Sequence, residues 1–319
     1  MKYNMQNNKR IRRDIVLSAA VLILAAVLFA GCGGSSAGSK SFPDDPEVLT
    51  KEIAAYLMAE VENPAPGSVG GDWLIKGIAG SGAEIPVSYY DIYYDNVRAE
   101  VKSKKGVLSD TYYTEYERVI IGLSAIGKET VVEGYDLAPY LDEFNRVTAQ
   151  GVNASCYALI AADEAGITLS NEEAYINDIL TRMNDEVMKK DYSYADYIAI
   201  ALEALSIYQE RTEIKEFIEK SLEQLSELQQ DDGSYGSCES TAECITALCR
   251  LGTDPRTDDR FIKNGKSAAD GLMVYYLGDG KFCHTLEIKD ADMMAAEKAL
   301  LAADSIRTLD QESGKEVIR

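Results

Sequence analysis

The stretch "QQDDGSYGSCESTAECITALCRLG", Gln229–Gly252, decides the fold. It is typical of one helix that ends, a tight polar turn, and a second helix rich in small residues. The turn contains Gly233 and Gly236, and glycine adopts backbone conformations that other residues avoid. Ser240 and Glu243 have the spacing of a capping box at the start of the second helix. We therefore interpret the turn as a joint between helices and not as an active site.

Segments like this second helix recur along the chain at intervals of about 40 to 50 residues. The sequence predicts that these small-residue helices end near Gly82, Gly127, Gly166, Ser206, Gly252 and Asp304. Longer, more charged segments separate them, near residues 47–62, 86–104, 136–148, 171–189, 212–229 and 259–276. A regular interval of this length indicates a repeat protein in which each unit is a pair of helices.

The two kinds of helix differ in how much of their surface is apolar. The segment 212–229 is one-sided, with an apolar face made of Ile214, Phe217, Ile218, Leu222, Leu225 and Leu228. The small-residue helices are apolar on nearly all sides, as buried helices are. Six buried helices ringed by six one-sided helices predict an all-α fold, an (α/α)6 toroid, over residues 47–306. Capping boxes at Thr114/Glu117 and Ser170/Glu173 support two helix starts. No segment has a regular alternation long enough to predict a sheet.

Two family resemblances support the toroid. "QQDDGSYG" resembles the QW-type turn of the squalene cyclase and prenyltransferase repeat proteins through Gln229, Gly233, Tyr235 and Gly236, with Tyr235 in place of Trp. The segments "YTEYERVIIGLSAIG", "GVNASCYALIAAD", "SCESTAECITALCRLG" and "RFIKNGKSAADGLMVYY" are similar to the toroid domain of bacterial surface proteins related to the helical domain of transcobalamin and intrinsic factor. The resemblance covers residues 47–305 and implies the fold.

The resemblance does not choose an activity, because this fold hosts cyclases, prenyltransferase subunits, cobalamin carriers and complement-like proteins. Cobalamin carriers hold their ligand between the helical domain and a smaller β domain, and this sequence has no counterpart of that β domain. We therefore expect a binding protein whose ligand is a small molecule, cobalamin-like or not, or else a glycan or protein partner. A terpenoid cyclase-like or prenyltransferase-like enzyme is the alternative.

The N-terminus has the layout of a secretory signal. Four basic residues between Lys9 and Arg13 precede an apolar run from Ile15 to Ala30. "LFAGC" resembles a bacterial lipobox, which implies that residues 1–31 are removed and that Cys32 is lipidated. The alternative is an uncleaved transmembrane anchor, but an anchor needs about 20 apolar residues. We expect a lipid-anchored protein on the extracytoplasmic face of the cell membrane, with residues 32–46 as a flexible tether and 307–319 as a polar tail.

The charge of the chain excludes one class of partner. Residues 1–31 hold five basic residues and one acidic residue, so the remaining chain has 27 Lys and Arg against 52 Asp and Glu, a net charge of −25. Nucleic acid is not expected as a partner, since phosphate contacts need clustered basic side chains. We interpret the negative charge as a solvated surface. We expect a monomer that uses no cofactor.

Five cysteines remain after Cys32, and an odd number cannot pair completely within one chain. We interpret most of them as small buried apolar residues. Cys238 and Cys283 each precede one of two consecutive small-residue helices, so a disulfide between them is one expectation and two separate thiols are the other. His284, the sole histidine, could meet Cys238 and Glu239 as in a prenyltransferase zinc site, but the Asp-x-Cys pattern of those enzymes is absent.

Other catalytic patterns are weak. The cyclase resemblance implies a DxDD acid, and none occurs here: the pairs at Asp44 and Asp231 belong to the linker and to the turn. Paired carboxylates for glycoside hydrolysis would come from Asp72, Glu115, Asp196 and Glu239, but their spacing singles out no two of them.

The starts of the small-residue helices are the predicted ligand site. If these helices run parallel, their N-termini gather at one mouth, where polar side chains converge. The candidate ligand-binding residues are Asp72, Trp73, Glu115, Tyr116, Asn153, Asp196, Tyr197 and Glu239. Asp72, Asn153 and Glu239 in particular are expected to line the pocket. The alternative is that the acidic residues among them only cap helices and balance their dipoles.

Overall fold

The computed structural model describes residues 41–191 and 193–314. The predicted signal segment, Cys32 and most of the predicted tether lie outside these residues. The fold is all-α: the described residues contain twelve α-helices, and their few short strands form three separate two-stranded hairpins. None of the described helices has both the length and the apolar content needed to cross a bilayer.

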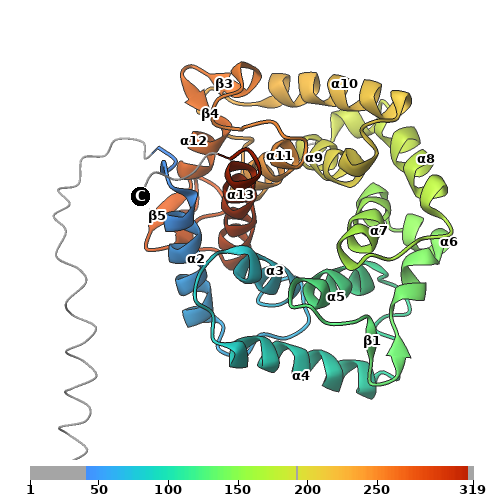
Figure 1. Cartoon of the computed structure of the whole chain (residues 1–319). Helices are drawn as coiled ribbons and strands as arrows, with labels where there is room; N and C mark the ends of the chain where they lie inside the picture. The colour runs from blue at the N-terminus through green and yellow to red at the C-terminus, as the bar shows by residue number, and fades with distance from the viewer. Residues whose placement is uncertain (1–40, 192, 315–319) are drawn as a thin grey trace, which may run out of the picture. The chain divides into compact units, whose positions relative to one another are not determined.

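Six of the helices, here called the ring helices, contact one another in a closed ring. Each ring helix contacts the ring helix that follows it in the sequence, and the last ring helix contacts the first (Figure 1). Most of their residues are buried or half-buried, and their alanines allow close approach. The ring helices are α3 (Asp72–Gly80), α5 (Thr114–Ala125), α7 (Val152–Ala165), α9 (Tyr194–Leu205), α11 (Cys238–Arg250) and α13 (Met293–Glu312).

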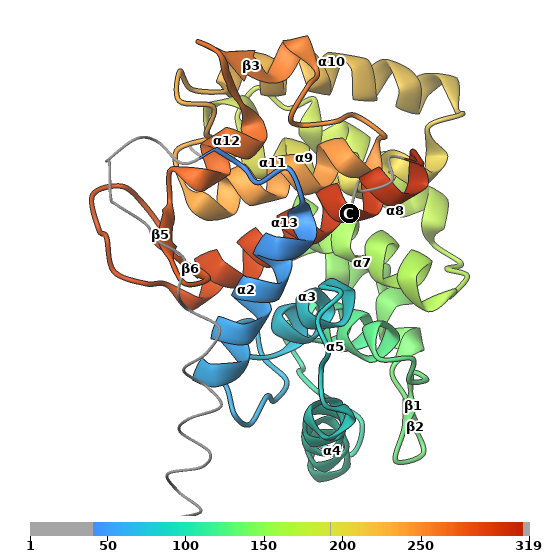
Figure 2. The same cartoon turned by 60° about the vertical axis from the view of Figure 1, so that its left-hand side comes forward.

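The other six, the flanking helices, alternate with the ring helices along the chain. The longest of them follow the predicted one-sided pattern: along α10, Ile214, Ile218, Leu222 and Leu225 are buried. In Figure 2, α2 lies along α13, and the two helices are in contact. The flanking helices are α2 (Pro46–Glu60), α4 (Val87–Ser103), α6 (Phe144–Thr148), α8 (Glu172–Met183), α10 (Thr212–Leu228) and α12 (Ala268–Met273).

Two predicted outer helices are much shorter than expected. The segment 136–148 contains the 3-10 turn Ala138–Asp142 and then the five-residue α6. In 259–276 a hairpin, β3 (Ile262–Lys263) and β4 (Lys266–Ser267), takes up the first half. Asn-Gly at the tip explains this, because both of its residues adopt positive φ and so favour a two-residue hairpin turn.

The other two hairpins have the same cause. β1 (Val131–Val132) pairs with β2 (Tyr135–Asp136) across Glu-Gly, and β5 (Tyr276–Gly278) pairs with β6 (Lys281–Phe282) across Asp-Gly. All four turn residues have positive φ. Each hairpin lies in a connection or at the end of a helix pair, so the all-α class is unchanged.

The three predicted capping boxes are wrong, because each helix begins at a different residue from the one assumed. Helix α11 begins at Cys238, and Ser237 is its N-cap, so Glu243 lies beyond the first turn. Helix α8 begins after Asn171, and the carboxylate of Asp142 binds the backbone N–H groups of both Ser170 and Asn171.

Helix α5 begins at Thr114 itself, which turns Glu117 into the core. The Glu117 side chain is fully buried, and neither of its oxygens has a hydrogen-bond partner among the described residues. Burial raises the pKa of this carboxyl well above its usual range, because no donor among the described residues stabilises the charged form.

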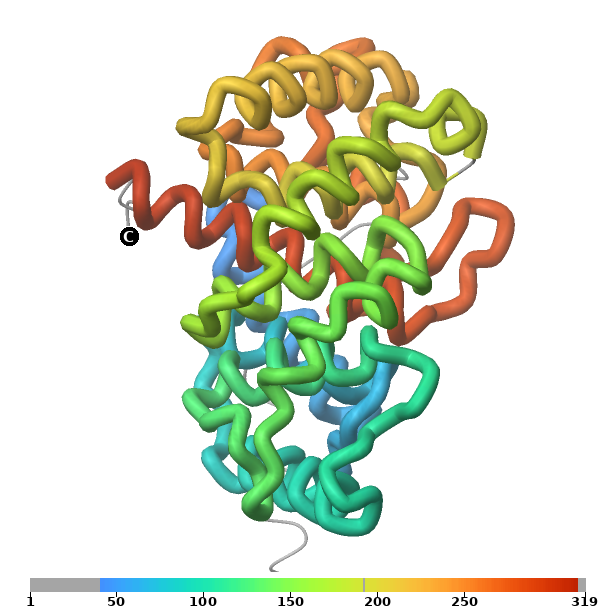
Figure 3. The backbone as a smooth tube through the Cα atoms, turned by 90° about the vertical axis from the view of Figure 1, so that its right-hand side faces the viewer, coloured from blue at the N-terminus to red at the C-terminus, as the bar shows by residue number. Residues whose placement is uncertain are grey.

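Ordered contacts extend beyond both expected bounds of the helical domain, residues 47 and 306. The backbone N–H of Phe42 donates to Asp270, and Phe42 packs on the core, so folded structure begins before residue 47. At the other end, α13 continues past the predicted boundary at 306 to Glu312, and Figure 3 shows its end projecting beyond the helices around it. Ile306 and Leu309 are buried, which explains why the helix continues.

The joint between α10 and α11 is held by backbone contacts. The side-chain amide of Gln229 donates to the carbonyls of Gly233 and Phe261, 2.9 Å in each case. Gly233 has φ +89°, and a Cβ placed on it would lie 2.2 Å from the carbonyl oxygen of Ser267. The turn is therefore a structural joint. It requires glycine at position 233 for two reasons: the positive φ, and the lack of space for a Cβ beside Ser267.

Candidate functional site

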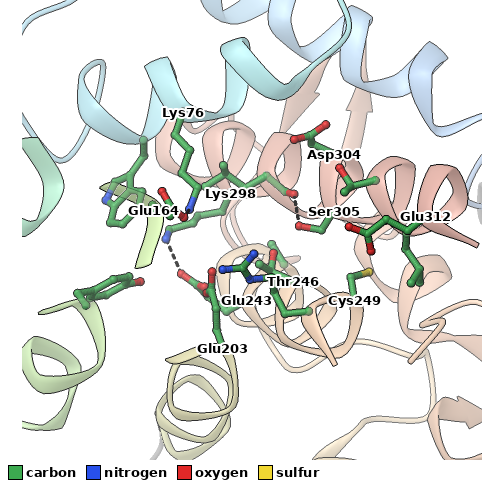
Figure 4. A pocket seen from close by; sticks show the side chains of 17 residues that line it. Lys76, Glu164, Glu203, Glu243, Thr246, Cys249, Lys298, Asp304, Ser305 and Glu312 are labelled. Atoms are coloured by element: carbon green, nitrogen blue, oxygen red, sulfur yellow. Dashed lines mark hydrogen bonds and ion pairs between the residues drawn. The ribbon is translucent and has the colours of Figure 1, made fainter. Parts of the chain in front are cut away.

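A cavity with a volume of about 250 Å³ lies among the ring helices, and we call it the ring cavity (Figure 4). Five of the six ring helices line it, mostly with residues of their later turns. Its wall is strongly charged. The charged side chains that line it are Lys76, Glu164, Glu203, Glu243, Arg250, Lys298, Asp304 and Glu312.

Two ion pairs between different ring helices cross the wall. Lys76 binds Glu164, and Lys298 binds Glu243. Burial alone would lower the pKa of Lys76, but the carboxylates of Glu164 and Glu203 outweigh it and raise that pKa. Lys76 is therefore a fixed cation, and each pair joins two helices whose backbones come from distant parts of the sequence.

Glu203 differs from the other acidic groups of the wall. It comes from the last turn of α9 and is only 7% exposed, yet its carboxylate makes no hydrogen bond to any described residue. Burial raises its pKa, and the nearby Lys76 opposes this in part. A buried acid without a hydrogen-bond donor is costly to ionise. Figure 4 shows it among Lys76, Glu243 and Lys298, facing the cavity.

An aromatic corner of the cavity adjoins the ion pair of Lys298 and Glu243. The rings of Trp73 and Tyr157 meet with centroids 5.2 Å apart, and the ammonium of Lys298 lies 4.4 Å from the centre of the Trp73 ring. Trp73 is the only tryptophan in the chain. The corner offers apolar surface next to the charged wall, which suits a ligand that has both a carbon skeleton and a charged group.

Of the eight residues predicted for the ligand site, only Trp73 lines the ring cavity. Asp72, expected at an open mouth, is completely buried. Its carboxylate accepts hydrogen bonds from the Tyr93 hydroxyl at 2.6 Å, the Gly67 N–H at 3.2 Å and the Arg118 guanidinium at 3.3 Å. Burial raises its pKa to about 6, although all three donors act to lower it. Asp72 holds the start of α3 in place.

The other predicted residues are scattered around the helix starts. Tyr116 stacks on Tyr140 in the core, with centroids 4.0 Å apart, and Tyr197 packs against the core. Glu239 binds His284 at 2.7 Å. Asn153 and Glu239, like Asp72, are not among the residues that line the ring cavity.

Two of the predicted polar groups have unused hydrogen-bonding atoms. One side-chain oxygen of Asn153 and one of Asp196 are buried without a partner among the described residues. Burial also raises the pKa of Asp196. Neither residue belongs to a cavity described here.

Glu115 lines a second cavity, of about 350 Å³, beside the starts of α3 and α5. The charged side chains of this second cavity already have partners. Lys104 binds Glu100 at 2.7 Å and lies 4.0 Å from Glu115. Arg118 binds Asp72. Every charged side chain that lines the second cavity is thus already paired with an opposite charge. The ring cavity is the stronger candidate.

The described residues contain no disulfide between Cys238 and Cys283, which was one of the two expectations for this pair. All five cysteines there are free and buried thiols. Cys238 donates to the carbonyl of Ala295 and Cys283 to that of Tyr275, so the two sulfurs point to different parts of the backbone. No three metal-ligating side chains gather among the described residues, and His284 is bound to Glu239 alone.

Glu297 supports the wall of the cavity from behind. It precedes Lys298 on α13 and is 1% exposed; one carboxylate oxygen accepts from the Gly70 N–H at 2.7 Å, and the other has no partner among the described residues. Burial raises its pKa to about 7, and the nearby Asp72 acts in the same direction. The carboxyl ties α13 to the loop before α3.

Sequence reasoning missed the charged residues of the ring cavity because it looked only at helix starts. The signal was present in the sequence. Lys76 in "DWLIKGIAG" and Glu203 in "YIAIALEAL" are the only charges of their helices beyond the first turn, which holds Asp72 in one and Asp196 in the other. A lone charge on a helix buried on all sides must face either an opposite charge or a cavity.

Comparison with known proteins adds no assignment: the sequence matches no family model and no curated protein.

Proposed function

We propose that this chain is a lipid-anchored protein of the extracytoplasmic face of a bacterial membrane, whose helices form an (α/α)6 toroid that binds a small polar ligand without transforming it. The closed contacts of the six ring helices and their alternation with six flanking helices support the toroid. The observation that carries the binding function is the ring cavity, in which eight charged side chains from ring helices surround about 250 Å³.

The composition of the wall favours a polar ligand over a terpene. A cyclase cavity needs aromatic walls to stabilise carbocations, whereas only two aromatic side chains, Trp73 and Tyr157, line this one. The volume favours a small molecule. An apolar cavity of about 150 Å³ holds benzene, so a cavity somewhat larger suits a metabolite with a short carbon skeleton. Most of a corrinoid would have to remain outside.

Filling the cavity is expected to abolish binding. Thr246 lines it from α11, and Thr246→Phe adds a ring to the space. In a screen of small polar metabolites, a compound that raises the Tm of the native protein should not raise the Tm of this variant. Thr181→Phe, an exposed position on α8, is the matched control and should respond as the native protein does. A ligand that binds Thr246→Phe unchanged contradicts the ring cavity as the site.

Cys32→Ser tests the location. If Cys32 is the lipidated residue, the variant is expected to accumulate as a precursor with no acyl chain, because lipidation precedes signal removal in the lipobox pathway that the resemblance implies. Metabolic labelling with a palmitate analogue and a gel shift measure this directly. Replacement of one of the buried cysteines, Cys156→Ser, is the control and should leave labelling intact. A labelled, processed Cys32→Ser protein contradicts the lipid anchor.

A further inference from the structure

Among the charged side chains that line the ring cavity, only carboxylates lack an ion-pair partner. Each basic side chain at the wall is already paired: Lys76 with Glu164, Lys298 with Glu243, and Arg250 with Asp163. Asp304 is bound by Arg307 from behind the wall, at 2.8 Å. The lining carboxylates without an ion pair are Glu203 and Glu312. What the cavity lacks is positive charge.

The helix ends add to this bias. Glu164, Glu203, Arg250 and Glu312 come from the last turns of α7, α9, α11 and α13, so four ring helices direct their C-terminal ends to the cavity. The C-terminus of a helix carries a partial negative charge on carbonyl groups that have no partner within the helix. A cation in the cavity is therefore favoured by the backbone as well as by the side chains.

Glu203 is the buried carboxylate that a cation inside the cavity would contact. The residue as a whole is only 7% exposed, and its carboxylate faces the cavity without a hydrogen bond to a described residue (Figure 4). Glu312 is exposed at the end of α13 and can be solvated by water. Burial raises the pKa of Glu203, and a bound cation would remove that cost by supplying the missing charge.

The donor set favours an organic cation over a metal ion. A metal site needs several ligating side chains close together, and no such group of three occurs among the described residues. An ammonium group needs only acceptors, because it carries its own N–H donors. The aromatic corner of Trp73 and Tyr157 supplies surface for a carbon chain.

We propose that the ring cavity binds a small organic cation with a primary ammonium group, which donates hydrogen bonds to the carboxylate of Glu203 while its carbon chain lies toward Tyr157. This inference rests on the proposed function, because it names the ligand class of the same cavity. No covalent step is involved.

The test uses Trp73 as the reporter. Because the chain has one tryptophan and it lines the cavity, the intrinsic tryptophan fluorescence of the purified full chain reports on that wall alone. The probes are n-butylamine and 1,4-diaminobutane as cations at pH 7, butan-1-ol as a neutral analogue and butanoate as an anion. The two amines are expected to change the fluorescence saturably, and the alcohol and the acid are not.

Glu203→Gln keeps the shape of the side chain and removes its charge. It is expected to weaken amine binding at least tenfold, which is the loss typical of a hydrogen bond to a charged group. Glu312→Gln removes the same charge from an exposed position and should weaken binding less than threefold. Since the Glu203 carboxylate makes no hydrogen bond to a described residue, the variant should remain folded.

The outcomes separate the two proposals. Equal amine binding by native protein and Glu203→Gln overturns the role of Glu203. Binding of butan-1-ol or butanoate that Thr246→Phe prevents overturns the cation class and leaves the cavity as a binding site. Amine binding that Thr246→Phe does not weaken overturns both. If none of the four probes binds, the cation class is overturned, and the metabolite screen alone decides the proposed function.

Discussion

Gly233→Ala is expected to lower the free energy of unfolding by more than about 3 kcal/mol. The residue has φ +89°, where a Cβ is strained, and the added methyl would lie 2.2 Å from the Ser267 carbonyl oxygen and 3.1 Å from the Gly271 nitrogen. Both obstacles are backbone atoms, which cannot rotate away as a side chain can. The joint between α10 and α11 would have to open, and Gln229 would lose its acceptor there.

Gly252→Ala separates the two causes. Gly252 also has a positive φ, +73°, but a Cβ there would meet nothing within 4 Å. Gly252→Ala should therefore lower the free energy of unfolding by about 1 kcal/mol, from the backbone conformation alone. Urea unfolding followed by circular dichroism measures both variants. Equal losses for Gly233→Ala and Gly252→Ala would show that the close contact with Ser267 does not exist.

Glu297→Gln is expected to change how stability depends on pH. The pKa of Glu297 is raised in the folded protein from 4.5 to about 7. Below pH 4.5 the group is protonated in both states. As the pH rises, the unfolded chain releases this proton first, so the native protein loses stability up to about pH 7. Between pH 5 and pH 8 the native protein should lose about 2 kcal/mol relative to Glu297→Gln.

The measurement is a series of urea unfolding curves from pH 5 to pH 8 for both proteins. Other groups titrate in this range, so only the difference between the two proteins tests the prediction. Glu227→Gln, at an exposed position on α10, removes one carboxylate with the same change in net charge and should run parallel to the native protein. Parallel curves for native protein and Glu297→Gln would contradict the raised pKa.

The sequence predicts the helices of the ring because burial on all sides leaves a clear pattern. The expected ends near Gly127, Gly166 and Gly252 agree with the ends of α5, α7 and α11, since each glycine has the positive φ that stops a helix. The flanking segments were predicted less well. In 259–276 the dipeptide Asn264-Gly265 forms a hairpin, and a strong local turn signal was overlooked in favour of the repeat.

The predicted ligand site lies at the helix starts, whereas the ring cavity is lined mostly by later turns of the same helices. Acidic residues at helix starts are common for electrostatic reasons, so Asp72 and Glu239 could not be distinguished by type. The structure separates them: Asp72 is buried under Tyr93 and Arg118, whereas Glu239 binds His284. Which charges meet across the ring, such as Lys76 and Glu164, depends on how the helices pack, and no local pattern in one sequence encodes that.

The contacts of α13 with α2 and α3 set an order of events during folding. More than 200 residues separate these partners: the Arg307 guanidinium binds the carbonyl of Gly80 at 2.6 Å, and Glu297 holds Gly70. A chain made from its N-terminus must keep the apolar sides of α2 and α3 uncovered until its last helix arrives. Such distant contacts slow folding, since the entropy of the whole loop is lost before they form. Helix α13 is thus the closing element, and a ribosome that stalls before residue 293 leaves the earlier helices as an open arc that is prone to aggregation.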